Sequence, residues 1–364
     1  MFLTAHDESF NHQTSLPHMM VSNSDPNWRE RYWFSIQDVE RQDFILSGGL
    51  GKYPNKDVLE GCVMVQHGDR QWNLRVSRAL LPEPGKMRVG PLSVEILEPF
   101  RILRFQLDHN ESGLAFDLTW TSDWPPFLEE RHFEVSRARV THDIIRYIQL
   151  GRWEGEVHVA DQHFAFTPST GWGERDHSWG IRPMASTPGD PPIASPEWNF
   201  LCFCPMQFET LALHLYIFES QAGRPTHLTA TLHDKAGEYD GDPIIGVDHD
   251  LEWDYSSSVR TLTGGRLTLH FQSHRRLEID LRTLPPRVYL QGGGYGVDQG
   301  NWKGEYHQEH EVWDLADPSR LKSYIKGTSD HMFQATCRGE IGYGIMEYLV
   351  RSGYEKYRRP PHAS

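Results

Sequence analysis

The chain has 364 residues and a formal net charge of −14 at pH 7, with a sequence pI of about 5.8. Such an acidic chain is a poor candidate for binding nucleic acid, because affinity for nucleic acid comes from lysine and arginine side chains that contact phosphates. The composition, 38% hydrophobic and 24% charged, is typical of a globular protein, and the length favours two domains over one.

The first residues turn acidic at once, without the basic and apolar regions of a signal peptide. No apolar run approaches the ~20 residues that a membrane span needs. The four cysteines, at positions 62, 202, 204 and 337, form no CxxC motif, which favours free thiols over a disulfide framework. We therefore expect a cytoplasmic protein with no integral membrane segment, and its oligomeric state stays open between a monomer and a homodimer.

The first half of the chain predicts strands behind a polar arm. Residues 1–27 form the arm, whose acidic group at residues 6–8 either folds over a cavity mouth or frays. Residues 29–36 predict a first strand, and the alternation of apolar residues over 103–120 predicts a half-buried hairpin. Residues 135–148 fit a helix and a strand about equally.

Residues 183–196 contain five prolines, and we place a linker at residues 184–197. Strand patterns resume beyond it, ending with a polar strand over residues 302–313 and a last strand over 342–349. A short helix is predicted only at residues 318–326. Many short strands at close spacing favour sandwiches or barrels, so we predict an all-β protein with domains at residues 28–183 and 198–364.

The central stretch, Gly171–Pro183, packs acids, bases and tryptophans between glycines. On a strand, Glu174, Asp176 and Ser178 would share one face, and Arg175, His177 and Trp179 would share the other. Rings around Asp176 would raise its pKa and let it act as an acid near neutral pH, whereas an adjacent arginine would hold it as an anion.

Each of these residues also has a structural interpretation. Asp176 either carries acid–base chemistry or caps a turn or pairs with Arg182. His177 either relays a proton or is a hydrogen-bonded structural histidine. Trp172 and Trp179 either line an apolar pocket, where their ring faces stabilise a cation, or pack in the core.

A second polar cluster lies at residues 305–311, with three glutamates and two histidines. Its density suggests a metal, but its spacing matches no known ligand set, so we interpret it as a solvated strand face and predict no metal site. The sequence contains no GxSxG elbow, no phosphate-binding P-loop and no HExxH motif. The glycines at 48–51 precede no βαβ pattern, so we also predict no dinucleotide or other cofactor.

The motif Gly171-x-x-x-x-Asp176-His177-x-Trp179-Gly180 resembles the tandem lipocalin-like family that includes the carotenoid 1,2-hydratases (hydroxyneurosporene synthases). Further segments fit the same family and extend the resemblance from about Trp33 to Tyr348. They are Arg146-x-x-Gln149-x-Gly151, Trp153-x-Gly155, Gly292-Gly293-Gly294-Tyr295-Gly296 and Trp302-x-Gly304-Glu305.

The resemblance implies two lipocalin-like β-barrels with a pocket near their junction. It also implies an aspartate that protonates a C=C bond before water captures the carbocation, and Asp176 matches that aspartate. Glu174 stands where the hydratases have an aromatic residue, which adds a second carboxylate. The family's upstream histidine and tryptophan have His158 and Trp153 as candidates here.

We therefore expect a cofactor-independent enzyme that acts on an apolar, isoprenoid-like molecule. It would be a lyase (a hydratase or dehydratase) or a cyclase. Asp176 would be the acid or base, supported by His177 and Glu174. The residues expected to bind substrate are Trp172, Trp179, Arg182, Gln149, Trp153 and Tyr295. The alternative is a lipocalin-type carrier of a hydrophobic ligand without chemistry.

Overall fold

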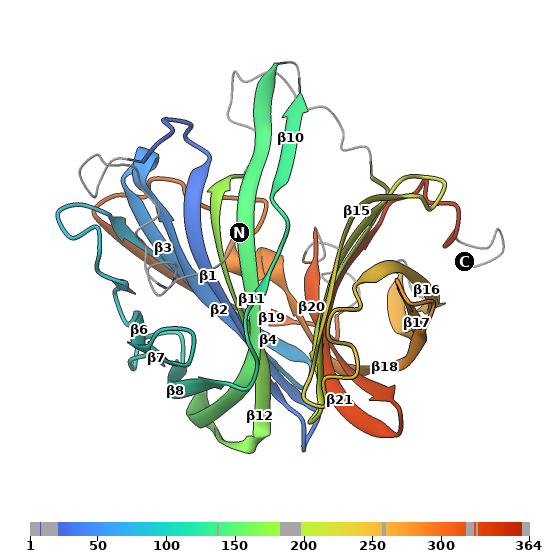
Figure 1. Cartoon of the computed structure of the whole chain (residues 1–364). Coiled ribbons are helices and arrows are strands. Elements are labelled where there is room, and N and C mark those ends of the chain that lie inside the picture. Colours follow the sequence, from blue (N-terminus) through green and yellow to red (C-terminus); the bar gives the residue numbers. More distant parts are fainter. Residues whose placement is uncertain are drawn as a thin grey trace. The chain divides into compact units, whose positions relative to one another are not determined.

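The computed structural model describes residues 8, 21–136, 138–182, 198–256, 260–317, 324 and 327–358, and these form β-strands almost throughout (Figure 1). The chain divides into two compact units. Unit 1 contains Met1–Ala194 and Leu290–Ala316, and unit 2 contains Ser195–Tyr289 and Asp317–Ser364. The predicted all-β class is confirmed.

Unit 1 holds a 13-stranded sheet whose main path runs β19-β4-β3-β2-β1-β12-β11-β8-β7-β6-β5, with β9 and β10 added on β11. Its elements are β1 (Trp28–Asp38), β2 (Phe44–Tyr53), η2 (Pro54–Lys56), β3 (Val58–His67), β4 (Arg70–Ala79), β5 (Arg88–Val89), β6 (Leu92–Glu98), β7 (Ile102–Leu107), β8 (Leu114–Ser122), β9 (Phe127–Leu128), β10 (His132–Ser136), β11 (Arg139–Val159), β12 (Gln162–Ile181), η3 (Leu290–Gly293) and β19 (Tyr306–Asp314).

The sheet of unit 1 curls into a barrel. β5 stands at one end of the strand order, yet it contacts β3 and β4 near the other end. Alternate side chains of the strands fill the interior with an apolar core, in which Phe34, Phe105 and Trp153 meet through their rings. Period-two alternation placed these residues inside, because successive side chains of a strand point to opposite faces.

Unit 2 holds an eight-stranded sheet in the order β15-β14-β13-β21-β20-β18-β17-β16. Contacts between β15 and β16, the two ends of that order, close it on its own apolar core. Its strands are β13 (Phe200–Gln207), β14 (Leu211–Glu219), β15 (Pro225–Asp234), β16 (Ile244–Asp254), β17 (Thr261–Phe271), β18 (Arg276–Tyr289), β20 (Ser329–Cys337) and β21 (Glu340–Val350).

The predicted second domain, residues 198–364, differs from unit 2. Residues 290–316 belong to unit 1, because β19 pairs along its whole length with the edge strand β4. The ambiguous segment at 135–148 is extended, in β10 and β11. The predicted linker lies outside the described residues, as does the predicted helix at 318–326 apart from Tyr324.

The cysteines are all free and buried. Cys202 and Cys204 point to the same side of β13 and belong to the apolar core of unit 2. Over the described part of the chain, we find no helix with the length and apolar character that a membrane span requires.

Candidate functional site

Residues 171–181 of the central stretch form the second half of β12, between β1 and β11. Arg175 and His177 point into the barrel interior, where both approach the hydroxyl of Tyr147. Asp176 points to the opposite side of the sheet, which we call the outer face. The sequence predicted this division of β12 into two faces.

Asp176 is largely buried on the outer face, with 9% of its surface exposed. Its carboxylate lies 4.0 Å from Nη1 of Arg146, while Nη2 of the same guanidinium lies 2.8 Å from Glu129. Arg146 therefore bridges two carboxylates, and this ion pair forms only while Asp176 is ionised. Among the described residues, Arg182 forms no ion pair with Asp176, although the sequence suggested that pairing.

Asp176 stands in a row of directly paired residues that crosses the outer face. The register pairs Asp176 with Trp33, Trp33 with Gly49, Gly49 with Cys62, and Cys62 with Arg75. Directly opposed residues point to the same side of a sheet. The row therefore joins the predicted acid–base residue to a thiol and a guanidinium, with a glycine in its middle that contributes no side chain.

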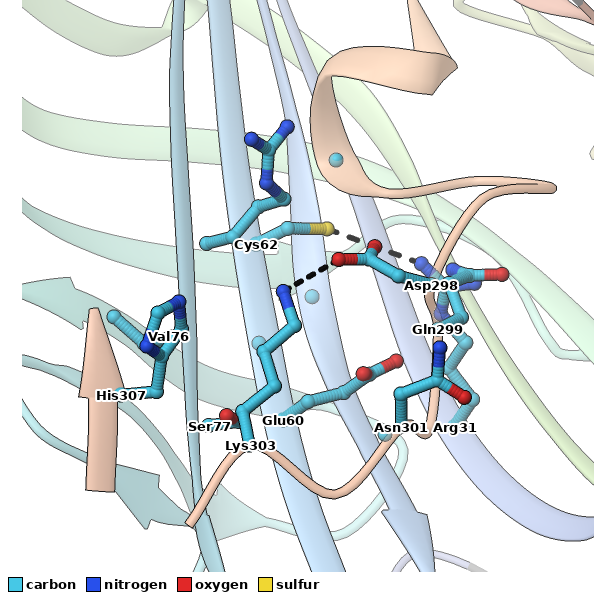
Figure 2. Close-up of a pocket in the computed structure, with 15 residues that line it drawn as sticks. Arg31, Glu60, Cys62, Val76, Ser77, Asp298, Gln299, Asn301, Lys303 and His307 are labelled. Atoms are coloured by element: carbon cyan, nitrogen blue, oxygen red, sulfur yellow. Dashed lines mark hydrogen bonds and ion pairs between the residues drawn. The ribbon is translucent and has the colours of Figure 1, made fainter. Parts of the chain in front are cut away.

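A pocket opens beside this row, over β1–β4 and under the chain segment that follows η3 (Figure 2). It encloses about 420 Å³, open solvent included. In Figure 2 the ammonium of Lys303 points to the carboxylate of Asp298, 2.5 Å away, and Arg31 approaches the Cys62 sulfur at 4.0 Å. The lining residues with ionisable side chains are Arg31, Glu60, Cys62, Arg75, Asp298, Lys303 and His307.

Burial raises the pKa of two groups in this pocket. Burial raises the pKa of the Cys62 thiol to about 11, so the thiol stays protonated at neutral pH. Burial also raises the pKa of Glu60, although the N–H of Gly300 and the hydroxyl of Tyr53 both donate to its carboxylate at 2.7 Å. Perturbed groups of this kind in a cleft are candidates for proton transfer.

Aromatic rings on the outer face hold arginine side chains. The Arg31 guanidinium lies 4.6 Å from the ring centre of Trp33 and 4.3 Å from that of Tyr295, and the two rings meet edge-on. The Arg152 guanidinium lies 3.5 Å from the ring centre of Trp172. Trp172 and Tyr295, both predicted to bind substrate, are therefore on the outer face, and their ring faces accept positive charge.

Glu174, the second carboxylate of the motif, lies two positions from Asp176 on the outer face and is 1% exposed. Its backbone N–H donates to the hydroxyl of Ser35 at 3.4 Å. Arg182, at the end of β12, bonds through its backbone N–H to the carbonyl of Asn27 at 3.3 Å. The structure thus places Glu174 on the same face of β12 as Asp176.

His177 is fully buried on the interior side. Its Nε2 lies 3.0 Å from the carboxylate of Glu30, its Nδ1 lies 3.2 Å from the hydroxyl of Tyr147, and its ring stacks on Tyr32 at 4.1 Å. Both ring nitrogens have partners, and the ring points away from Asp176. The geometry matches the structural interpretation of this histidine.

Three further residues predicted to bind substrate also lie on the interior side. Gln149 accepts hydrogen bonds from Arg175, and Trp153 donates from Nε1 to the carbonyl of Ser35 at 3.0 Å within the core. The ring of Trp179 lies 5.4 Å from that of His177. The sequence therefore predicted one site from residues that the sheet divides between its two faces.

The polar cluster at residues 305–311 lies on and next to β19. Glu309 accepts hydrogen bonds from Lys303 at 2.6 Å and from Arg75 at 3.1 Å, and Glu311 accepts from Arg75 at 3.1 Å. These cations lower the pKa of Glu309 to about 2, although burial opposes them. These carboxylates are therefore explained as ion-pair partners of Arg75 and Lys303. The pairs with Arg75 also attach β19 to β4.

The described residues hold one group whose spacing suits a metal ion. Glu156, His158 and His163 lie at the β11–β12 hairpin, with ligand atoms all within 4.8 Å of one another. His158 pairs directly with His163 across the hairpin. The group is largely exposed and lies at the hairpin end of β12, far from Asp176. His158 therefore belongs to this group and does not lie in the outer-face site.

Sequence reasoning missed the pocket residues Arg31, Glu60, Cys62 and Arg75. They stand on four separate strands, and only the register of the sheet brings them together. The sequence also assigned Glu8 to a polar arm, whereas the Glu8 carboxylate is buried in the barrel interior. The acidic group at residues 6–8, suggested to fold over a cavity mouth, was the available signal.

Comparison with known proteins fixes the family. A family model described as a family of unknown function (DUF8625) matches residues 3–356, so the chain belongs to that family. No curated protein matches the chain. The crystal structure of a putative AttH from Nitrosomonas europaea is similar in fold, with a TM-score of 0.55 and 11% identity over 94% of this chain and 98% of that one.

Proposed function

For this member of a family of unknown function, we propose a cofactor-independent acid–base enzyme. It acts on a small organic molecule at the outer face of unit 1, and Asp176 transfers the proton. The observation that carries the proposal is the cross-strand row that places Asp176 on the same surface as the pocket. Asp176 itself does not line the pocket, but a carboxylate with little exposure on the same sheet face as perturbed titratable groups is a candidate for proton transfer.

The surroundings of Asp176 support a cationic intermediate. Glu174 adds a second carboxylate, and the rings of Trp33 and Trp172 already accept guanidinium groups at 4.6 and 3.5 Å. A carbocation placed over such rings would be stabilised in the same way. Because the ion pair with Arg146 requires the carboxylate form, we infer that Asp176 acts as the base in the last step of a dehydration. A substrate hydroxyl that has taken a proton from solvent leaves as water, and Asp176 then removes a proton from the carbon next to the cation, so that a C=C bond forms.

The substrate proposal combines the resemblance with the pocket. The tandem lipocalin-like family suggests an isoprenoid-like skeleton for a hydratase, dehydratase or cyclase. The pocket lining adds the Arg31 guanidinium, and also Arg75 and Lys303, which pair with carboxylates of the same region. Such a lining suits a polar or anionic end group, so we propose an apolar skeleton with a polar terminus as the substrate.

The test is turnover by Asp176→Asn on acyclic terpenols and terpene alkenes. We expect the wild type to convert at least one of them and the variant to be slower by about 10²–10⁴-fold, the usual contribution of a positioned acid or base. Asp161→Asn, in the exposed β11–β12 turn, is the matched control. Full turnover by Asp176→Asn on a substrate that the wild type converts would exclude the acid–base role.

A carrier without chemistry is the second candidate, and the ion pair between Asp176 and Arg146 favours it. In a carrier this pair is structural. Asp176→Asn would then lower the free energy of unfolding by about 1–3 kcal/mol, as expected for a broken buried interaction, and leave ligand affinity unchanged. Wild-type protein that binds a terpenoid but returns it unchanged in every assay would favour the carrier.

A further inference from the structure

A buried carboxylate occupies the interior of unit 1, on the side of β12 opposite to Asp176. The carboxylate belongs to Glu8, which is 1% exposed. Its Oε2 accepts from Nη2 of Arg175 at 2.8 Å and from the backbone N–H of Phe100, and its Oε1 accepts from Nη1 of Arg175. The hydroxyls of Tyr147 and Tyr32 donate to the same Oε1 at 3.0 and 3.3 Å.

The donors around this carboxylate are held in place by other contacts. Gln149 accepts from Nε and Nη2 of Arg175 at 3.2 and 2.7 Å. The amide of Gln149 is itself held, since its Nε2 donates to the carbonyls of Phe100 and Trp124 at 2.7 and 2.9 Å and to the hydroxyl of Ser122 at 2.7 Å. Arg175 is therefore oriented by the strands of the barrel and does not depend on Glu8 for its direction.

Phe100 contributes its N–H from an unusual backbone conformation. Its φ is 59°, in the left-handed region that residues with a Cβ rarely adopt. Such conformations persist where the surrounding structure enforces them, and they concentrate at ligand sites. Rings complete the surroundings, because the Arg175 guanidinium lies 5.0 Å from the ring centre of Trp120 and 5.1 Å from that of Tyr147.

The site requires an anion. Arg175 is fully buried, and a buried guanidinium without a counter-charge strongly destabilises a fold. The nearby carboxylate of Glu30 lies 3.0 Å from His177, which leaves Glu8 as the carboxylate on the guanidinium among the described residues. A planar pair of oxygens fits the two parallel N–H groups of the guanidinium, so the chemistry selects a carboxylate.

We propose that the donors of Arg175, Tyr147, Tyr32 and Phe100 form a binding site for small monocarboxylates, and that Glu8 is its internal occupant. Glu8 comes from the segment before β1, whereas the donors come from β1, β11, β12 and the β6–β7 turn. A free carboxylate and Glu8 compete for one site. This site is independent of the proposed chemistry at Asp176, because it lies on the other face of the sheet.

The test is acetate binding to Glu8→Ala, because acetate replaces the atoms that this substitution removes. Isothermal titration with sodium acetate, against sodium chloride at equal ionic strength, gives the affinity. We expect Glu8→Ala to bind acetate at least about tenfold more tightly than the wild type, and acetate to raise its Tm. Glu8→Ala/Arg175→Met should show neither response.

Two results would overturn the proposal. One is equal acetate affinity in Glu8→Ala and the wild type, and the other is acetate binding that survives the loss of Arg175. If Glu8→Ala does not fold in chloride, refolding in acetate supports the site, and failure to refold in acetate contradicts it. Glu8→Gln, which keeps the size of the side chain without its charge, should bind acetate with an affinity between those of the other two proteins.

Discussion

Glu60 and Asp176 are carboxyl groups on one face of one sheet, yet their surroundings differ. Asp176 has a guanidinium at 4.0 Å, whereas the hydrogen bonds to the Glu60 carboxylate come from the neutral donors Tyr53 and Gly300. Burial raises the pKa of Glu60 above the usual 4.5. Two carboxyl groups in such different surroundings on one surface are candidates for an acid and a base.

The raised pKa of Glu60 predicts how stability depends on pH. The folded state binds this proton more tightly than the unfolded chain, so the contribution of Glu60 to stability falls as pH rises from about 4.5 through the folded pKa. Glu60→Gln removes the ionisable group and therefore this loss of stability at higher pH. Urea unfolding between about pH 4 and about pH 8 should show the variant gaining stability relative to wild type as pH rises.

The matched control is Glu111→Gln, in an exposed loop, whose stability relative to wild type should change much less over the same range. A Glu60→Gln protein that loses stability relative to wild type with rising pH would mean that Glu60 is stabilised as an anion. That result would remove Glu60 as a candidate proton donor.

At the residue scale, the sequence predicted which side chains of β12 share a face, because strand alternation depends only on position. It did not predict that Glu8 would lie on Arg175, since the two are 167 positions apart and no local pattern links them. The pairing of Asp176 with Arg146 was missed for the same reason. Such contacts depend on register and on side-chain direction.

At the scale of the strand, β12 depends on glycine where it approaches β1. A Cβ on Gly173 would lie 1.9 Å from the carbonyl oxygen of Ser35 and 2.9 Å from Nε1 of Trp153. Both atoms are held in the barrel, since the Trp153 Nε1 donates to the same carbonyl. Gly173 therefore lets the strand that carries Asp176 pack closely against its neighbours.

Gly173→Ala should lower the free energy of unfolding by about 1–3 kcal/mol, the usual effect of overpacking, because β1 and β12 must separate. The control is Gly246→Ala in β16, where the nearest atom to an added Cβ is 3.9 Å away. Chemical denaturation gives both values. Equal stability of the two variants would show that β12 can shift without cost and that the outer-face geometry is loosely held.

Strands with clear alternation, such as β7 and β8, could be predicted from sequence. The partner of β19 could not, because its polar pattern specifies a strand but no neighbour. Its position on β4 depends on the ion pairs of Arg75 with Glu309 and Glu311, which join residues more than 230 positions apart. The domain prediction therefore assigned residues 290–316 to the second half of the chain.

At the scale of the whole molecule, each unit has its own apolar core. Phe105 is fully buried in unit 1, with ring centres of Phe34 and Phe116 at 4.7 and 4.8 Å. Phe105→Ala should lower the stability of unit 1 by about 3–5 kcal/mol through lost burial and a cavity. Because the cores are separate, hydrogen exchange in β13 and β17 should stay close to that of the wild type.

Equal loss of protection in the strands of both units would contradict that expectation and make the chain one cooperative structure. Composition and strand spacing predicted two β-rich halves. They could not predict that the chain returns to unit 1 after β18, because long-range pairing leaves no local trace in the sequence.

The most direct test of the central claim is solvent deuterium incorporation. Wild-type protein, Asp176→Asn and Asp161→Asn would each be incubated in D₂O with acyclic terpenols and alkenes. Mass spectrometry would then measure the deuterium content of the recovered substrates and products. We predict that the wild type and Asp161→Asn exchange carbon-bound hydrogen or form product, and that Asp176→Asn is slower by at least about 10²-fold. Equal incorporation by Asp176→Asn and the wild type would contradict an acid–base role for Asp176.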